Sequence, residues 1–543
     1  MTEEHLLGDL ALTAPEQRLV DAFRRGVQVD LREGDAAKDD PRRGKEWGPR
    51  RTVRAEVIER LVLGTGVAPE AGRVPALRLR GARITGRLDL AHGTIGCPVW
   101  LEDCSFAEPV VCDRADVRHL SLAGSRLPAL RADYLRSATD LDLTRLTARE
   151  LRLYGAEVNG NLELDEARLV NVGGCALYGT HLKVNGSLHA NGASIEGEAR
   201  LYGAIVQDSV LMIGAWLLNP GGTALAAGRM SVGGSLYLRR GDRGGPVRRA
   251  YVADGKIRLD GVTIGSTLRM EGAVMHNPGQ CALEATNLNV GHFADLRGVT
   301  VRGWLTLSES RIGSSLDLTG GRVISDAQVS LDLSEIEAKT VSLPESCSGT
   351  IDLTDTRVVT LDLHGVATTG TMRLGGLHFE RLTPELPPKQ LLDWLRRSVA
   401  TYEPHPYEQL VAMFRRIGHD EDARTVLLAK ERRRRATLRL PGRLWGYVQD
   451  VMMGYGYRPL RAGAWLLLPL ALATWYYSIR PPRPLDADNG LAFSPLAYAL
   501  DLLLPVVDLG QEKAFGPATP VDQWFGYAVV AIGWILATSS RPE

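Results

Sequence analysis

The sequence predicts a mainly β protein: a right-handed quadrilateral β-helix, which is a solenoid of short parallel strands, between an N-terminal helical cap and a C-terminal α-helical membrane segment. Three observations predict it. Apolar-x-apolar triplets recur through residues 77–374, and Leu77, Leu88 and Val99 start the first three at intervals of 11 residues. The middle residue of most triplets is polar. An uncharged apolar stretch of about 18 residues, long enough to span a hydrocarbon core, covers residues 462–479.

The triplets predict strands with one buried face. Alternate side chains of a strand point to opposite faces, so a Leu-x-Leu triplet buries both leucines and exposes the middle residue. Glycine and alanine between triplets, as at Gly81 and Ala82, permit tight corners. Two triplet units form a coil of about 21 residues, and each coil buries its inward side chains only against its neighbours. We therefore assign residues 75–380 to the solenoid. A helical period of 3.6 residues does not produce isolated triplets 11 residues apart, so an α-helical structure is excluded for this region.

Residues 1–74 predict a helical cap. Thr13 and Glu16 have the spacing of a capping box, and Pro15 suits the first turn of a helix. A second helix is expected from about residue 52 to residue 63, because apolar residues recur on one face until Gly64. An uncovered solenoid end would expose apolar side chains and unpaired strand edges, so we expect this segment to cover the first coil.

Residues 381–440 predict a helical adapter. The triplets stop after residue 374, and three prolines mark the change to helix. Residues 407–417 and 421–435 then form an antiparallel helix pair across Gly418, similar to a single TPR hairpin. One such repeat does not build a peptide-binding groove, which favours a structural role.

Residues 441–543 predict membrane attachment, with spans at about 462–479 and 524–540. Aromatic residues at the end of the first span suit a membrane interface. A basic run precedes it: Arg432, Arg433, Arg434, Arg435, Arg439 and Arg443. By the positive-inside rule, these residues predict a cell-membrane protein whose β-helix lies in the cytoplasm.

Between the two predicted spans, residues 493–509 are apolar but include Asp501 and Asp508. One interpretation is a re-entrant or pore-facing segment in which Asp501 serves as an ion or proton group. The other is an interfacial helix that keeps both carboxylates among the lipid headgroups. The sequence favours the interfacial helix and leaves the first interpretation open.

The composition and the absence of several motifs exclude some classes of function. The 64 Lys and Arg residues balance 64 Asp and Glu residues, so the chain is not expected to bind nucleic acid generally. Six cysteines without a CxxC pair predict reduced thiols and no zinc site. A Rossmann glycine motif, a P-loop, HExxH and GxSxG are all absent from the sequence. We therefore expect no cofactor and a function other than catalysis.

The triplets resemble the pentapeptide-repeat and quadrilateral β-helix families. The chain as a whole is similar to a group of actinobacterial membrane proteins that carry the label membrane-associated oxidoreductase. That similarity rests on the triplets, on residues 39–41 and 47–58, and on residues 500–511. The resemblance implies membrane attachment and an oxidoreductase activity, although no motif in the sequence matches that activity.

We predict a membrane-anchored cytoplasmic scaffold or sensor that docks a protein on its outward strand faces. Asp332, Asp352 and Asp362 mark this surface, and Asp332 and Asp352 should stack because they lie about one coil apart. The expected partners are the lipid bilayer and a protein, with self-association as a further option and no nucleic acid. Two alternatives remain: a small oligomeric channel or transporter component gated by the solenoid, and the oxidoreductase that the resemblance implies.

Overall fold

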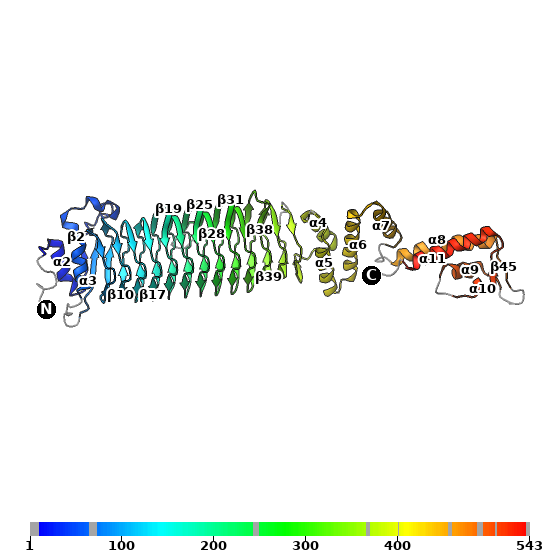
Figure 1. Ribbon diagram of the computed structural model, residues 1–543, viewed down its shortest axis with the longest axis horizontal. Coiled ribbons are helices and arrows are strands. Elements are labelled where there is room, and N and C mark those ends of the chain that lie inside the picture. The colour runs from blue at the N-terminus through cyan, green and yellow to red at the C-terminus, as the bar shows by residue number, and fades with distance from the viewer. Residues whose placement is uncertain are drawn as a thin grey trace. The chain divides into compact units, whose positions relative to one another are not determined.

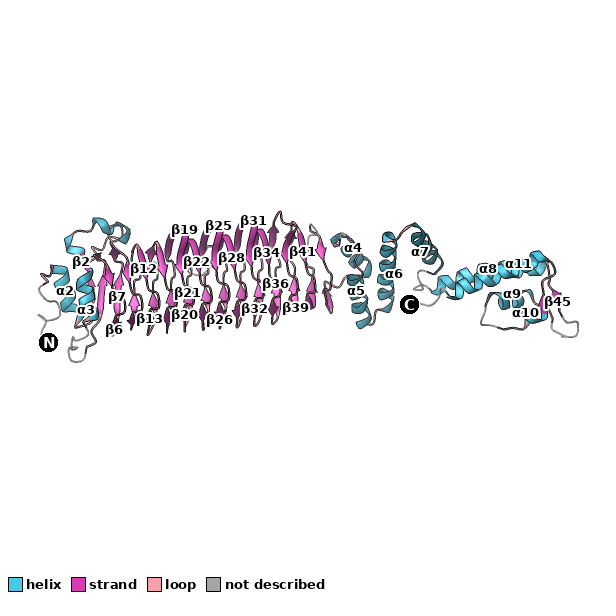
Figure 2. Cartoon of the chain, in the orientation of Figure 1, coloured by secondary structure: helices cyan, strands magenta, loops and turns pink. Residues whose placement is uncertain are grey.

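The computed structural model describes residues 10–64, 73–242, 249–364, 370–399, 401–453, 459–485, 492–504 and 508–538. The chain forms two compact units. The first comprises Met1–Glu385 with Arg397–Val399, and the second comprises Leu386–Arg396 with Ala400–Glu543. Figure 2 shows that strands dominate the first unit and helices the second.

The first unit is a parallel β-solenoid of about 13 turns, so the predicted β-solenoid is confirmed. A typical coil has four short strands: β14 (Leu141–Asp142), β15 (Thr147–Ala148), β16 (Glu150–Arg152) and β17 (Glu157–Val158). The next coil begins at β18 (Leu162–Glu163), where Leu162 lies opposite Leu141. Figure 1 shows these coils stacked in sequence order. The right-handed sense and the likeness to pentapeptide repeats stay predictions.

The core lies inside the stack of coils. The outer residues of the triplets, such as Leu141 and Leu143, are fully buried, while Asp142 between them is only half-buried. The same pattern recurs two strands later, at Leu151 in β16 and at Leu153 just after it. Each leucine therefore packs against the leucine of the coil before and the coil after, as the triplets predict.

Three long strands lengthen alternate coils. They are β19 (Arg168–Tyr178), β25 (Trp216–Ala226) and β31 (Val274–Glu284). Each contains a short loop that an asparagine amide closes, as where Asn171 Nδ2 donates to the Cys175 carbonyl at 2.8 Å. The coil from Leu162 to Leu188 consequently takes 26 residues, whereas the coil from Leu141 to Leu162 takes 21.

The N-terminal cap is only partly helical. Its elements are α2 (Ala14–Phe23), β1 (Val29–Asp30), the 3₁₀ helices η1 (Pro41–Glu46) and η2 (Pro49–Arg51), β2 (Thr52–Arg54) and α3 (Ala55–Leu63). β1 pairs with β3 (Leu77–Arg80) and β2 with β4 (Arg83–Thr85), both in parallel. The predicted helix start at residue 52 is wrong, because residues 52–54 extend a solenoid ladder before the helix begins.

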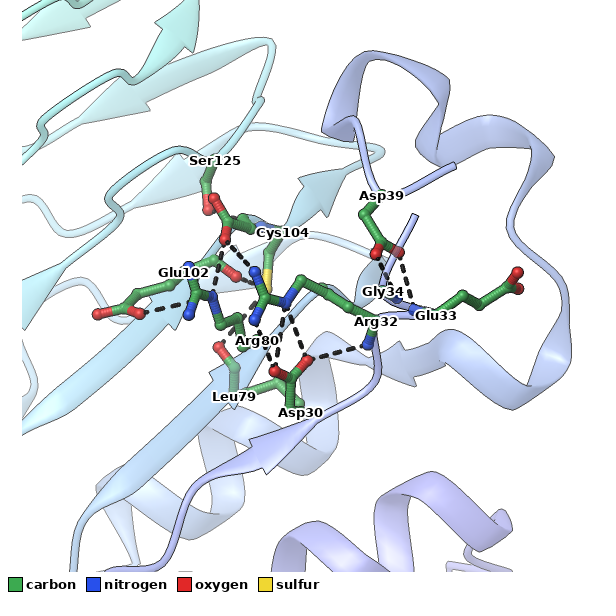
Figure 3. A network of polar contacts seen from close by, with 12 residues as sticks. Asp30, Arg32, Glu33, Gly34, Asp39, Leu79, Arg80, Glu102, Cys104 and Ser125 are labelled. Atoms are coloured by element: carbon green, nitrogen blue, oxygen red, sulfur yellow. Dashed lines mark hydrogen bonds and ion pairs between the residues drawn. The ribbon is translucent and has the colours of Figure 1, made fainter. Parts of the chain in front are cut away.

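A polar network fastens the cap to the first coils (Figure 3). Arg32 binds the Asp30 carboxylate through Nη2 at 2.8 Å, and its Nη1 lies 3.5 Å from Asp103. Arg80 reaches the same Asp103 at 2.7 Å. The hydrogen bonds from Arg32 lower the pKa of the Asp30 carboxyl. The network therefore links cap strand β1 to residues of two successive coils.

The six cysteines are all unpaired, and four of them are buried. Cys104 shows the consequence, because burial raises the pKa of its thiol to about 12. A thiol with so high a pKa is almost never the reactive thiolate at neutral pH. This agrees with the prediction of reduced cysteines that fill the core.

The helices of the second unit are α4 (Pro388–Ser398), α5 (His405–Arg416), α6 (Asp420–Thr437), α7 (Leu440–Met453), α8 (Pro459–Ile479), α9 (Pro495–Leu503), α10 (Gln511–Ala514) and α11 (Pro520–Thr538). Two short strands, β45 (Arg483–Pro484) and β46 (Phe515–Gly516), pair with each other. The predicted hairpin is present as α5 and α6, with Tyr407, Phe414 and Val426 buried.

The predicted membrane spans are not supported. Among the described residues, no helix combines the length and the apolar character that crossing a membrane requires. Residues 462–479 lie within α8, and residues 524–538 lie within α11. Residues 539 and 540 of the second predicted span lie outside the described residues.

The contacts of Glu16 predict a pH-dependent contribution to stability. Glu16 is 1% exposed and binds Arg54 at 2.8 Å and the Thr13 backbone N–H at 2.9 Å. Burial alone raises the pKa of this carboxyl, but the hydrogen bonds from Arg54 and Thr13 outweigh it and lower the pKa to about 2. The ionised form is therefore favoured in the folded state.

We expect Glu16→Gln to lower the free energy of unfolding of the first unit by about 1–3 kcal/mol at pH 7. The difference from the wild type should shrink as the pH falls from about 4.5 toward about 2, where the wild-type carboxyl becomes protonated. Chemical denaturation followed by circular dichroism measures both effects. Glu46→Gln, which alters an exposed ion pair, is the control; equal losses in the two variants would contradict the role of Glu16.

Candidate functional site

The predicted strand-face acids occupy two different faces of the solenoid. Asp332 in β38 (Val329–Asp332) lies directly opposite Asp352 in β41 (Thr350–Asp352), which confirms that these two stack in adjacent coils. Asp362 ends β42 (Arg357–Asp362), which pairs with β39 (Glu337–Ser342) and β44 (Arg381–Thr383) in the other large sheet. The three acids therefore do not form one surface.

Each of these carboxylates holds the corner that follows it. The backbone N–H two residues later donates to it, from Ser334 to Asp332 and from Thr354 to Asp352 at 3.0 Å, and from His364 to Asp362 at 2.9 Å. This is the hydrogen bond of an Asx turn. It recurs at Asp89, Asp142, Asp295 and Asp317.

The Asx turn explains how residues other than glycine occupy the corners. Glu335 and Asp355, one position beyond the N–H donors, have φ values of 56° and 55°. This left-handed conformation is costly for a residue with a Cβ, so a hydrogen bond that fixes the turn offsets part of the cost. Glycine and alanine were expected at the corners, and the turn-holding role of aspartate was not predicted, although the Asp-Leu-x-x pattern could have indicated it.

Side chains also contact two of these carboxylates. Arg373 Nη1 lies 3.1 Å from Asp352 Oδ2, and the His364 ring nitrogen Nδ1 lies 2.6 Å from Asp362. Burial raises the pKa of Asp362, but the hydrogen bonds from the His364 N–H and ring outweigh burial and lower it. These acids are therefore turn-holding groups, which does not favour a role for them in catalysis.

Glu163, Asp165 and His189 form a group that the sequence analysis did not single out. One ligand-type atom of each lies within 4.8 Å of the others. Carboxylates and imidazole can hold a divalent metal ion. However, His189 Nδ1 already lies 3.1 Å from Glu163, and the Asn191 N–H donates to Asp165 at 2.7 Å. The repeat in the sequence does not reveal this group, because the extra loop of β19 places Glu163 and His189 26 residues apart.

Asp501 is a buried structural group. It is 6% exposed, and its two oxygens accept hydrogen bonds from the backbone N–H groups of Leu509 at 2.7 Å and Glu512 at 2.8 Å. Asp508 is exposed and accepts from the Gly510 N–H at 3.0 Å, with the Lys513 ammonium close by. Asp501 thus fixes the start of α10, and Asp508 lies at the surface.

The basic run joins α6 to α7. Arg432 and Arg435 both bind the carboxylate of Asp450, at 2.8 Å and 3.1 Å. Arg435 also lies over the Tyr447 ring, 3.8 Å from its centroid. Arg443 closes the end of α6 by donating to the Leu438 carbonyl at 2.8 Å.

The other members of the run also have local contacts. Arg433 donates to the Tyr407 hydroxyl at 3.4 Å, Arg434 lies 3.6 Å from Glu431, and Arg439 is exposed. The run therefore has a structural role within the second unit, and its predicted role in membrane topology stays a prediction.

Helices α8 and α11 share a core and also expose large apolar side chains. Ala473, Tyr477, Tyr498, Leu503 and Val529 are among the residues of the buried core. The exposed set, which we call the C-terminal apolar surface, comprises Leu467, Leu468, Leu472, Trp475, Ile479, Val521, Trp524, Tyr527 and Ile532. Trp475 is 65% exposed and Trp524 is 74% exposed. Exposed apolar side chains of this size gathered on two packed helices favour an interaction surface.

Comparison with protein-family models, with curated proteins and with solved structures finds no match.

We expect Asp352→Ala to lower the free energy of unfolding by about 1–2 kcal/mol, because the Thr354 N–H and Arg373 both lose their acceptor. Asp352→Asn keeps a carbonyl oxygen at this position and should cost about half as much. Chemical denaturation measures the difference. An alanine variant as stable as the wild type would contradict the turn-holding role.

Asp501→Ala should destabilise the second unit by about 1–3 kcal/mol, because two backbone N–H groups lose their acceptor in a buried position. Asp508→Ala is the matched control, and a change below about 0.5 kcal/mol is expected there because the side chain is exposed. Because both units contain tryptophan, hydrogen–deuterium exchange of the peptide that contains α10, followed by mass spectrometry, measures the loss in this unit. If the two variants lose equal stability, Asp501 does not hold α10.

Proposed function

We propose that the chain is a non-enzymatic scaffold or sensor attached to a lipid bilayer. In this proposal the second unit contacts the membrane, and the β-solenoid, on the cytoplasmic side, presents a rigid surface to a protein partner. The observation that carries the proposal is the C-terminal apolar surface of α8 and α11.

That surface needs an apolar partner. Leu467, Leu468 and Trp475 are each more than half exposed on α8, and Trp524 is 74% exposed on α11. Transfer of such side chains from water to an apolar phase contributes about 1.5–3 kcal/mol for each one fully buried. Tryptophan is favoured where acyl chains meet headgroups, which supports a bilayer as the partner.

The solenoid suits a scaffold because the carboxylates on its outer surface form hydrogen bonds within its own turns and so hold the coils in place. Asp332, Asp352 and Asp362 hold corners and leave a continuous, rigid stack of strands. In a solenoid, each coil is supported by its neighbours along the whole length, so a long surface keeps one shape. Such a surface can dock a partner without a conformational change.

Two alternatives have weaker support. A channel or transporter component would use Asp501 for ions, but both of its oxygens accept backbone hydrogen bonds. An oxidoreductase rests on the family resemblance alone. The described contacts therefore favour attachment and docking over transport or redox chemistry.

Liposome flotation tests the proposal. The full chain, mixed with phosphatidylcholine vesicles that contain a fifth of phosphatidylserine by composition, should float with the vesicles. A Leu468→Glu, Trp475→Glu double variant should float about tenfold less, because charged side chains are costly in the apolar phase. Val172→Glu, at a position that is 79% exposed on the solenoid, is the control and should float like the wild type.

A wild-type chain that stays at the bottom of the gradient would overturn membrane attachment. Equal loss in the Val172→Glu control would show that flotation reports added charge in general and does not depend on the C-terminal apolar surface.

A further inference from the structure

A groove runs along the outward face of the solenoid where the cap meets it. Its volume is about 540 Å³, and η1 of the cap forms one side. The other side is a strand ladder in which Arg83, Ser105, Arg126 and Thr147 lie opposite one another in successive coils. Pro128, Arg149 and Val170 also line the groove, and Pro128 and Val170 add apolar surface.

The cap approaches this ladder closely because residue 44 is glycine. A Cβ at Gly44 would lie 2.1 Å from the Ser105 Cβ, so any side chain there would force η1 away from the solenoid. Arg126 Nη1 donates to the Arg42 carbonyl at 2.7 Å, and Arg83 Nη1 donates to the Lys45 carbonyl at 3.2 Å. The groove is therefore a built feature of the seam between cap and solenoid.

The groove carries a surplus of positive charge. Five cations line it, and the lining contains no carboxylate: Arg42, Lys45, Arg83, Arg126 and Arg149. Arg42 is neutralised by Asp40 at 2.7 Å. Among the residues that the structure describes, no carboxylate lies within ion-pair distance of the other four. The described contacts of Arg83 and Arg126 are with neutral carbonyls, and that of Arg149 is with the Asn171 amide oxygen at 3.3 Å.

This arrangement attracts anions although the whole chain has no net charge. A guanidinium presents several N–H donors in one plane, and one used on a carbonyl leaves others for a carboxylate. Arg83 and Arg126 occupy the same column two coils apart, which places their backbones roughly 10 Å apart. In a polyproline II peptide, which has three residues per turn, residues three apart lie on the same side and are separated by about 9 Å.

We propose that this groove binds an acidic segment of a protein partner in polyproline II conformation, with carboxylates three residues apart on Arg83 and Arg126 and apolar side chains between them against Pro128 and Val170. The proposal rests on the proposed docking function and names the chemistry of the partner. The groove lies in the cap and the first coils, whereas membrane attachment is proposed for the second unit. Either proposal can therefore fail while the other holds.

Fluorescence anisotropy with the full chain tests the proposal. The probe is a fluorescein-labelled synthetic peptide of about ten residues with glutamate at every third position and proline and alanine between, a spacing that matches the three-residue turn of polyproline II. A second peptide has the same composition with its glutamates in one block. We expect the spaced peptide to bind at least about threefold more tightly, and added salt to weaken both.

Arg126→Glu should weaken binding of the spaced peptide by at least about tenfold, because it replaces an attraction with a repulsion. Since Arg126 also holds η1, Arg149→Glu, whose described contact is with Asn171 and not with the cap, provides a second variant with the same expected loss. Arg118→Glu, at an exposed arginine outside the groove, is the matched control and should change affinity by less than about twofold.

Equal weakening by Arg118→Glu would overturn the groove as the binding site. Equal affinity for the two peptides would overturn the proposed three-residue spacing of the carboxylates. Inorganic pyrophosphate that binds as tightly as the spaced peptide, and competes with it, would overturn the peptide as the ligand and assign the groove to small phosphate anions.

Discussion

Every coil of the solenoid depends on the coils on either side of it. The backbone of one coil completes its hydrogen bonds with its neighbours, and the inward leucines bury their surface only between them. Both ends of such a stack are therefore unstable unless something covers them. In the cap, β1 and β2 continue two ladders, and the network of Arg32, Arg80 and Asp103 fastens β1 to the first coils. The cap thus adds one strand to each of two ladders and then covers the end of the solenoid.

The same dependence explains how much the sequence predicted. A residue that must repeat its environment in every coil leaves a periodic trace, so the triplets predicted the strands, the buried leucines and the stacking of Asp332 on Asp352. The helical hairpin of α5 and α6 was likewise predicted from local apolar spacing. These features depend on neighbours at a constant separation in the sequence, which is why one sequence was enough.

Features that join residues at irregular separations left no such trace. The extra loop in β19 shifts the register by five residues and hides the meeting of Glu163 and His189. Asp450 lies 18 residues from Arg432, and its contact with the basic run depends on the angle between α6 and α7. The outward aspartates were expected to be a free surface, but each is used by a backbone N–H two residues away, a short-range contact that the triplet pattern does not reveal.

The groove at the seam follows from the same constraint. To cover the first coil, the cap must cross from the solenoid end to its side, and only glycine at position 44 lets η1 lie against Ser105. The carbonyl groups of η1 then need donors, and arginines of the adjoining ladder supply them. An arginine that donates to a neutral carbonyl leaves a net positive charge at that position, whereas an arginine paired with a carboxylate leaves no net charge. Closing the end of the solenoid in this way therefore concentrates positive charge beside the seam, and that charge supplies the binding energy for an acidic partner.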